Sequence, residues 1–138
     1  MSSLGFLDTN VLVYAYDSTN PAKRRVARGL LEEAVKGMHV ISTQVLAEFA
    51  AAMLHRVTPR ADPKLLAEAL DVLAPVRLIV ADGEVVRRAI AARTSYGLHF
   101  YDSMIVAAAE RAGCDRLLSE DFNSGQSYFG ITAENPFR

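Results

Sequence analysis

Four carboxylates come from well-separated segments of the chain, at positions where a metal-dependent enzyme would need acids. They are Asp8, Glu48, Asp102 and Asp121. Each has an ordinary alternative role as a helix cap, a solvent-facing side chain or a turn residue. If all four converge on one crevice, their like charges raise one another's pKa, and the cluster is destabilising unless protons, basic side chains or cations compensate it.

Divalent cations are the compensation that best suits such a cluster. Mg²⁺ and Mn²⁺ bind carboxylate and water oxygens, whereas zinc would normally require His or Cys. The three histidines form no ligand motif, and Cys114 is the only cysteine. One or two Mg²⁺ or Mn²⁺ ions would lower the pKa of a bound water and stabilise charge on a phosphate. The acids therefore indicate hydrolysis of a phosphodiester bond.

The elements that must position these acids are strands and helices in alternation. Short apolar runs alternate with longer stretches of helical periodicity, a pattern typical of βαβ units and a mostly parallel sheet. We predict strands at residues 4–7, 39–41, 77–80 and 116–118, with a weaker fifth at 130–132.

The helices that fill the gaps carry recognisable end signals. Capping side chains predict three helix starts, at Asn20-Pro21, Asp62-Pro63 and Asp82. Gly37 and Gly113 fit as residues that end two of the helices.

The expected sheet decides which acids matter, because ligands of open α/β sheets bind beyond the carboxyl ends of the strands. Asp8 closes the first predicted strand and Asp121 follows the fourth. Asp102 lies in the first turn of a helix, where the helix dipole favours a carboxylate. These three acids are therefore expected at one edge of the sheet.

Glu48 stands out because its helix is otherwise so apolar. Only a narrow polar stripe remains there, and at about 100° per residue it contains Gln44, Glu48 and His55. The stripe faces either solvent or a polar cleft lined by the other acids. We expect His55 and His99 at the rim, because neither has an evident catalytic partner.

Composition bounds the class of protein. The 138 residues, 51% hydrophobic and 22% charged, suffice for one core, so a single domain over residues 1–138 is expected. No apolar run reaches the roughly 18 residues that a membrane span needs, so no membrane association is expected. The start, Met1-Ser2-Ser3-Leu4-Gly5, lacks a basic-then-apolar secretion signal, and the expected location is the cytoplasm.

The net charge of -1 excludes a protein held to nucleic acid by total charge alone, but local patches remain. Two predicted helices carry basic groups, Lys23, Arg24, Arg25 and Arg28 on the first and Arg87, Arg88 and Arg93 on the second. They are either solvated faces or phosphate contacts beside the acids. Four aromatic residues either pack at the core and rim or stack on an unpaired base, namely Tyr14, Tyr16, Phe100 and Tyr101.

Four motifs, in order along the chain, resemble those of PIN-domain endoribonucleases. They are Asp8-Thr9-Asn10-Val11-Leu12-Val13-Tyr14-Ala15, Leu46-Ala47-Glu48-Phe49, Tyr101-Asp102-Ser103-Met104-Ile105-Val106-Ala107-Ala108-Ala109 and Leu118-Ser119-Glu120-Asp121-Phe122. Any one motif is weak, whereas the ordered set is specific. The resemblance is in particular to the toxin halves of bacterial VapBC-type toxin-antitoxin pairs, and it covers essentially the whole chain, including Asn135-Pro136-Phe137.

This resemblance implies a three-layer α/β/α fold with a mostly parallel sheet of four or five strands. It also implies Mg²⁺- or Mn²⁺-dependent cutting of single-stranded or structured RNA, a homodimer, and an antitoxin protein that covers the site. By the same resemblance the metal-binding acids would be Asp8, Glu48, Asp102 and Asp121. Asn10 would hold Asp8 or a phosphate, and Ser119 would form a hydrogen bond near the metal or its water.

Some alternatives stay open at this point. Glu48 and Asp121 would bind metal either directly or through water, and Glu120 competes with Asp121 for the inward position. A haloacid-dehalogenase-type phosphatase also has an aspartate after its first strand, but here Asn10 replaces its second Asp and all the lysines precede the third strand. A PIN-like module that binds a partner without turnover is the other alternative, and the presence of all four acids argues against it.

Overall fold

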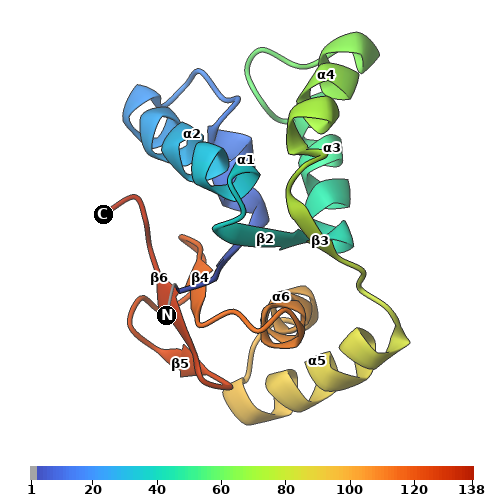
Figure 1. The fold of residues 1–138 in the computed structure, drawn as a ribbon, viewed down its shortest axis with the longest axis vertical. Coiled ribbons are helices and arrows are strands. Elements are labelled where there is room, and N and C mark those ends of the chain that lie inside the picture. Colours follow the sequence, from blue (N-terminus) through green and yellow to red (C-terminus); the bar gives the residue numbers. More distant parts are fainter. Residues whose placement is uncertain (1–2) are drawn as a thin grey trace.

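The sheet brings distant parts of the chain side by side (Figure 1). In the computed structural model, which describes residues 3–138, these residues form a six-stranded sheet with the order β3-β2-β1-β4-β6-β5. The strands are β1 (Gly5–Leu7), β2 (His39–Ser42), β3 (Arg77–Ile79), β4 (Arg116–Leu118), β5 (Ser127–Tyr128) and β6 (Ile131–Glu134). All neighbouring pairs are parallel except β5 and β6. The predicted α/β class with a mostly parallel sheet is confirmed, with one short strand more than expected.

Helices cover both faces of this sheet. They are α1 (Thr9–Tyr14), α2 (Pro21–Val35), α3 (Thr43–His55), α4 (Pro63–Leu73), α5 (Gly83–Tyr96) and α6 (Phe100–Arg111). Figure 1 shows α1 to α4 above the sheet and α5 and α6 below it, which gives three layers. In the described part of the chain, no helix combines the length and the hydrophobicity that crossing a membrane requires. Met1 and Ser2, which belong to the segment expected to lack a secretion signal, lie outside the described residues.

The helix ends follow from local side-chain chemistry, as predicted. Asn20, Asp62 and Asp82 are the N-caps of α2, α4 and α5, and each accepts a hydrogen bond from a backbone N–H of the first turn. Gly37 and Gly113 directly follow the C-caps of α2 and α6, with φ of +91° and +76°. Glycine adopts this left-handed conformation without steric penalty, so these residues end the helices cleanly.

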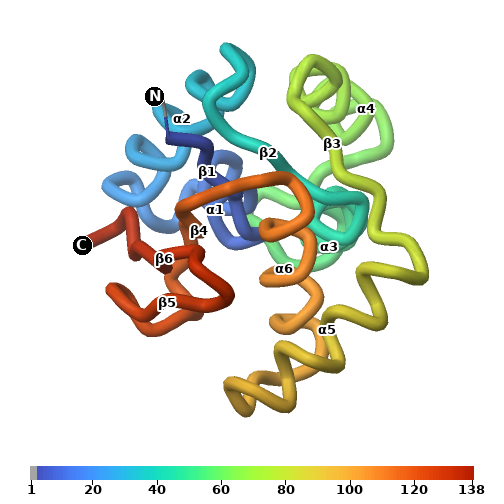
Figure 2. Tube along the Cα trace, turned by 60° about the horizontal axis from the view of Figure 1, so that its bottom comes forward, coloured from blue at the N-terminus to red at the C-terminus, as the bar shows by residue number. Residues whose placement is uncertain are grey.

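The central strand β1 is buried along its whole length. It pairs with β4 in a register that places Leu7 opposite Leu118, so the next residues, Asp8 and Ser119, leave the sheet side by side. Figure 2 shows α1, α3 and α6 gathered near one another, and all three helices contribute side chains to one pocket. The parallel register therefore directs several polar segments to one edge of the sheet, where the strands end.

Candidate active site

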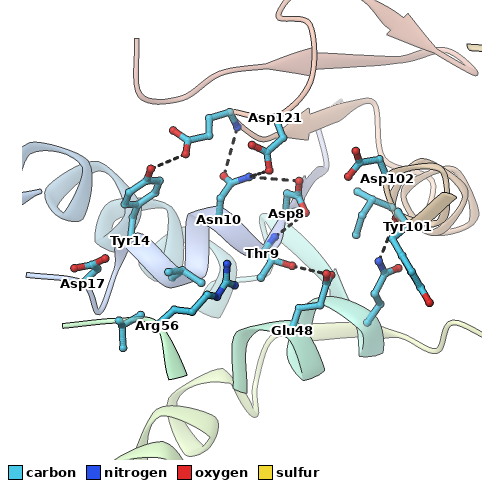
Figure 3. A pocket seen from close by; sticks show the side chains of 15 residues that line it. Asp8, Thr9, Asn10, Tyr14, Asp17, Glu48, Arg56, Tyr101, Asp102 and Asp121 are labelled. Carbon is cyan, nitrogen blue, oxygen red and sulfur yellow. Dashed lines mark hydrogen bonds between the residues drawn. The ribbon is translucent and has the colours of Figure 1, made fainter. Parts of the chain in front are cut away.

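A pocket of about 420 Å³ lies where β1 and β4 end (Figure 3). Its lining includes all four acids that the sequence singled out, Asp8, Glu48, Asp102 and Asp121. They come from the start of α1, the middle of α3, the first turn of α6 and the segment after β4. The structure thus brings the four carboxylates together, and their role as metal ligands stays a prediction.

Asp8 is both a helix cap and the most buried of these acids, since only 5% of its surface is exposed. One carboxylate oxygen accepts a hydrogen bond from the Thr9 backbone N–H at 2.7 Å and caps α1. The other accepts one from the Ser119 hydroxyl at 2.7 Å. The capping role therefore leaves the second oxygen at the pocket, so Asp8 can be a helix cap and a pocket acid at the same time.

Asn10 connects the two acids that follow the central strands. Its side-chain amide donates to the Ser119 hydroxyl at 3.0 Å, to Asp121 at 3.1 Å and, at a longer 3.4 Å, to Asp8. The Ser119 oxygen also accepts the backbone N–H of Asp121 at 3.1 Å. Asn10 and Ser119 therefore lie between the carboxylates of Asp8 and Asp121 and fix their relative positions.

Glu48 and Asp102 approach the pocket from two different helices. Glu48 is exposed and accepts a hydrogen bond from the Thr9 hydroxyl at 3.2 Å. Asp102 is half-buried at the start of α6, and the nearby Gln44 amide donates to the Tyr101 carbonyl at 3.1 Å, which joins α3 to α6. The polar stripe that contains Gln44 and Glu48 thus faces the pocket.

His55 shares that stripe in sequence but does not line the pocket. It is the last residue of α3, and it stays exposed. At the next residue, Arg56, the backbone leaves the helical conformation, with φ of -122° and ψ of -31°. This change of direction sends Arg56 rather than His55 toward the pocket, so the helical periodicity overestimated how far the stripe extends.

The carboxylates raise one another's pKa. Burial raises the pKa of Asp8 to about 7, and the charges of Asp121 and Asp102 add to this effect, while hydrogen bonds from Ser119 and Thr9 oppose it. Burial also raises the pKa of Asp102, assisted by the charges of Asp121 and Glu48 and opposed by His99. Among the described residues, no basic side chain contributes to lowering the pKa of Asp8, so the acids form a concentration of negative charge around it.

These residues fit a hard divalent cation by the chemistry of their donors. In residues 3–138, no group of three or more His, Cys, Asp or Glu side chains is arranged so that it could hold a metal ion. Glu48 is engaged by the Thr9 hydroxyl and Asp121 by the Asn10 amide. The donor set is nevertheless all oxygen, which suits Mg²⁺ or Mn²⁺, and the raised pKa of Asp8 is what a bound cation would lower.

Glu120 is engaged elsewhere at the rim of the pocket. It accepts a hydrogen bond from the Lys23 ammonium at 2.8 Å and another from the Tyr14 hydroxyl. Its neighbour Asp121 is the acid that contacts Asn10. Of the two adjacent acids, Asp121 is therefore the one joined to Asp8 through the Asn10 amide.

The sequence model of the PIN domain family matches residues 5–125, which is most of the chain. The chain belongs to the PIN domain family. Its membership explains why the acids lie at the carboxyl ends of the strands in a three-layer α/β/α fold. It also places the chain outside the haloacid-dehalogenase phosphatases that the sequence left as an alternative.

Solved structures of similar shape include a toxin-antitoxin complex and a toxin. The chain is similar to a protein in a toxin-antitoxin complex from Klebsiella pneumoniae (TM-score 0.69, 20% identity, covering 96% of this chain and 97% of that one). It is also similar to FitAcB from Neisseria gonorrhoeae (TM-score 0.67, 17% identity, covering 97% of this chain and 99% of that one). A third similar structure is VapC20 from Mycobacterium tuberculosis, a sarcin-ricin loop cleaving toxin. It matches with a TM-score of 0.64 and 14% identity, covering 82% of this chain and 86% of that one. No curated protein matches the chain by sequence. At these identities the structures support the fold.

The predicted basic and aromatic groups divide between this PIN pocket and other surfaces. Lys23 reaches the pocket rim, whereas its neighbours Arg24, Arg25 and Arg28 line a separate hollow. Arg88 forms an ion pair with Glu110, so its guanidinium is already engaged within the protein. Among the aromatic residues, Tyr14 and Tyr101 line the pocket, Tyr16 packs on Phe49, and Phe100 packs against the core.

Thr9 and Arg56 are among the pocket residues that sequence reasoning missed. The Thr9 hydroxyl contacts Glu48, and the only signal for it was its place between Asp8 and Asn10. Arg56 lines the pocket from beyond the end of α3, outside every motif and every basic group. Its position depends on the direction that the chain takes after α3, and no local pattern of residues predicts that direction.

Proposed function

We propose that this PIN domain is a Mg²⁺- or Mn²⁺-dependent endoribonuclease and the toxin of a toxin-antitoxin pair. The observation that supports this most is the meeting of four carboxylates in one pocket, with Asp8 buried among them. PIN-domain nucleases generally use divalent metal, and the oxygen-only donor set suits such ions. The substrate is cytoplasmic RNA, and the reaction is hydrolysis of a phosphodiester bond.

The proposed roles follow from the resemblance to PIN-domain nucleases and from the oxygen donors that these residues offer. Asp8 and Asp102 bind the ion or ions directly, and Glu48 and Asp121 bind directly or through water. One or two bound cations supply a water of lowered pKa and stabilise charge on the phosphate and the leaving oxygen. Asn10 and Ser119 hold the carboxylates of Asp8 and Asp121 through the hydrogen bonds described above.

Two protein partners belong to the proposal. A cognate antitoxin is proposed because the similar structures include toxin-antitoxin complexes. A second copy of the chain is proposed as well, to form a homodimer. Val86 and Ile90 support the homodimer, because they lie four residues apart on one side of α5 and both are exposed.

The test is cutting of a 5′-labelled RNA pool by purified protein in Mg²⁺, in Mn²⁺ and in EDTA. Asp8→Asn and Asp102→Asn should each lower the rate by at least about 100-fold, because each removes one negative oxygen donor from the proposed site. Asp71→Asn, at an exposed position on α4, is the matched control and should cut like the natural protein. Sequencing the 5′ ends of the fragments then locates the cut.

Two results would count against the proposal. Cutting at the natural rate by both Asp8→Asn and Asp102→Asn would refute the assignment of the site. RNA binding without cutting by the natural protein, in either metal, would instead support the alternative of a PIN-like module that binds without turnover.

A further inference from the structure

Arg56 is the one basic side chain among the described residues that line the acidic pocket. Six carboxylates share that lining with it, Asp8, Asp17, Glu48, Asp102, Glu120 and Asp121. Lys23 lies nearby at the rim, but its ammonium is already paired with Glu120 at 2.8 Å. Arg56 is therefore the remaining source of positive charge for any anion that enters.

The backbone that carries Arg56 is held firmly in place. Its own N–H bonds to the Ala52 carbonyl at 2.8 Å, and the next residue, Val57, is buried. The carbonyl of Thr58 accepts the backbone N–H of Ser18 at 2.9 Å and its hydroxyl at 2.8 Å. The segment after α3 is thereby fastened to the loop after α1, and the Arg56 side chain extends from a fixed base.

The guanidinium of Arg56 is not engaged by a side chain of the protein. Within residues 3–138 no ion pair or side-chain hydrogen bond joins it to another residue, although Asp17 and Glu48 line the same pocket. Figure 3 shows Arg56 reaching toward Thr9 and away from Asp17. Its donors are therefore available, in the planar fork that matches the oxygens of a phosphate.

An RNA strand needs such a group at this place. The strand carries one negative charge per nucleotide into a pocket lined by carboxylates, and a metal ion at those acids serves only the phosphate that reacts. A cationic side chain beside the neighbouring phosphate would offset the repulsion between that phosphate and the carboxylates of the pocket. In Figure 3 Arg56 lies on the far side of Asp8 and Thr9 from Asp102 and Tyr101, so a strand that crosses the acids passes Arg56 on one side.

We propose that Arg56 binds the RNA backbone phosphate next to the one that is cut, and so positions the strand across the pocket. Arg56 acts on the substrate's placement and takes no part in the proton transfers. This proposal rests on the proposed ribonuclease function and adds to it a residue that fixes where the strand lies. It predicts an effect on substrate binding and on its salt dependence, with the chemical step unchanged.

The experiment measures kcat and KM for a labelled single-stranded RNA pool at several KCl concentrations. Arg56→Gln should raise KM about tenfold and leave kcat within about twofold, because one charge-assisted contact to phosphate is lost. The slope of log(kcat/KM) against log[KCl] should become shallower by about 0.7, the value for one phosphate contact to a single strand. A purely structural role would not change that slope.

Two further variants sharpen the result. Arg56→Lys keeps the charge but not the fork, so it should keep the natural salt slope with a KM between those of the natural protein and Arg56→Gln. Arg60→Gln removes an exposed arginine of the following turn that does not line the pocket, and it should behave like the natural protein. Circular dichroism melting checks that each variant is folded.

The outcomes separate this proposal from the function on which it rests. If the natural protein cuts RNA and Arg56→Gln keeps its KM and salt slope, the role of Arg56 is refuted and the ribonuclease function stands. A fall in kcat at unchanged KM would also overturn the positioning role. If the natural protein cuts no RNA, the ribonuclease function fails and the proposal for Arg56 fails with it.

Discussion

Replacing Asp8 with asparagine should stabilise the metal-free protein above neutral pH, although it removes a proposed metal ligand. The carboxyl is 5% exposed, and burial together with Asp121 and Asp102 raises its pKa to about 7. Asparagine has almost the same shape and no charge at any pH. The substitution therefore removes the cost of a buried, uncompensated negative charge and keeps most of the local packing.

The magnitude follows from the difference between folded and unfolded pKa. Raising the pKa of Asp8 from 3.8 to about 7 corresponds to about 4 kcal/mol against the ionised form. Because the folded value is the higher one, the folded state binds the proton more tightly. The contribution of Asp8 to stability is therefore greatest below about pH 4, falls as the pH rises from about 4 to 7, and stays low above that range.

Asparagine also loses one hydrogen bond at this position. The oxygen that accepts the Ser119 hydroxyl becomes an NH₂ group, and the lost hydrogen bond costs about 1 to 2 kcal/mol. The net effect is a gain of about 2 to 3 kcal/mol at pH 8 and a loss of about 1 to 2 kcal/mol at pH 4. At about 4 °C per kcal/mol for a chain of this size, the melting temperature at pH 8 rises by roughly 10 °C.

The assay is thermal unfolding by circular dichroism in EDTA between pH 4 and 8.5, with Asp71→Asn as the control on an exposed acid. Added Mg²⁺ or Mn²⁺ at 100 times its Kd should stabilise the natural protein by about 2.7 kcal/mol and Asp8→Asn by much less. An equal difference in melting temperature at pH 4 and at pH 8 would refute the reasoning, because the ionisation of Asp8 would then carry no cost.

Three other substitutions test the support of the site and the fold. Asn10→Ala should weaken Mn²⁺ binding about 10- to 100-fold in titration calorimetry, because Asp8 and Asp121 lose the amide between them; unchanged affinity would remove Asn10 from the site. Gly5→Ala should destabilise the fold by about 1 to 3 kcal/mol in urea unfolding, since a Cβ there would lie 2.4 Å from His39 Nδ1. The effect of Gly5→Ala should shrink in a His39→Ala background, and additive effects would show that the clash is not the cause. Ile90→Glu should convert a dimer to a monomer in light scattering, and an unchanged mass would exclude α5 from the proposed interface.

Much of the fold was predictable because its signals are local. The N-caps at Asn20 and Asp62 act within one turn, so the helices begin where the sequence indicates. The strand at Arg116–Leu118 matches its predicted bounds. Leu117 and Leu118 are buried in it, as expected for a short apolar run between a helix and a polar turn. By contrast, the two-residue β5 exists only through its antiparallel pairing with β6, and a pairing of that length leaves no periodicity in the sequence.

The last strand shows the same limit in another form. The prediction began it at Gly130, but Gly130 has a φ of +83° and belongs to the turn before β6. The preceding Phe129 also has a positive φ, 51°. A tight turn that places both residues in left-handed conformations is specified by the pairing of β5 with β6, so the apolar pattern alone could not locate its end.

The acids of the site were predictable for a reason that does not extend to their neighbours. Asp8 comes directly after β1 and Asp121 lies three residues after the end of β4, and a parallel sheet sends the residues after its strands to one edge. Arg56 reaches the same pocket only because the chain leaves α3 there and is held by the loop after α1. Position along a strand is encoded locally, whereas a side chain that arrives from the end of a helix depends on tertiary packing.

Asp8 shows how the fold maintains an acid that it would be more stable without. The fully buried strand β1 fixes the backbone just before Asp8, and α1, which Asp8 caps, fixes the backbone just after it. Hydrogen bonds from the Thr9 N–H and the Ser119 hydroxyl lower its pKa but do not offset its burial. The carboxylate therefore cannot turn toward solvent without giving up the cap and the hydrogen bond from Ser119. A site built on rigid elements can hold charge in this unfavourable state, and the same rigidity makes it ready for a cation.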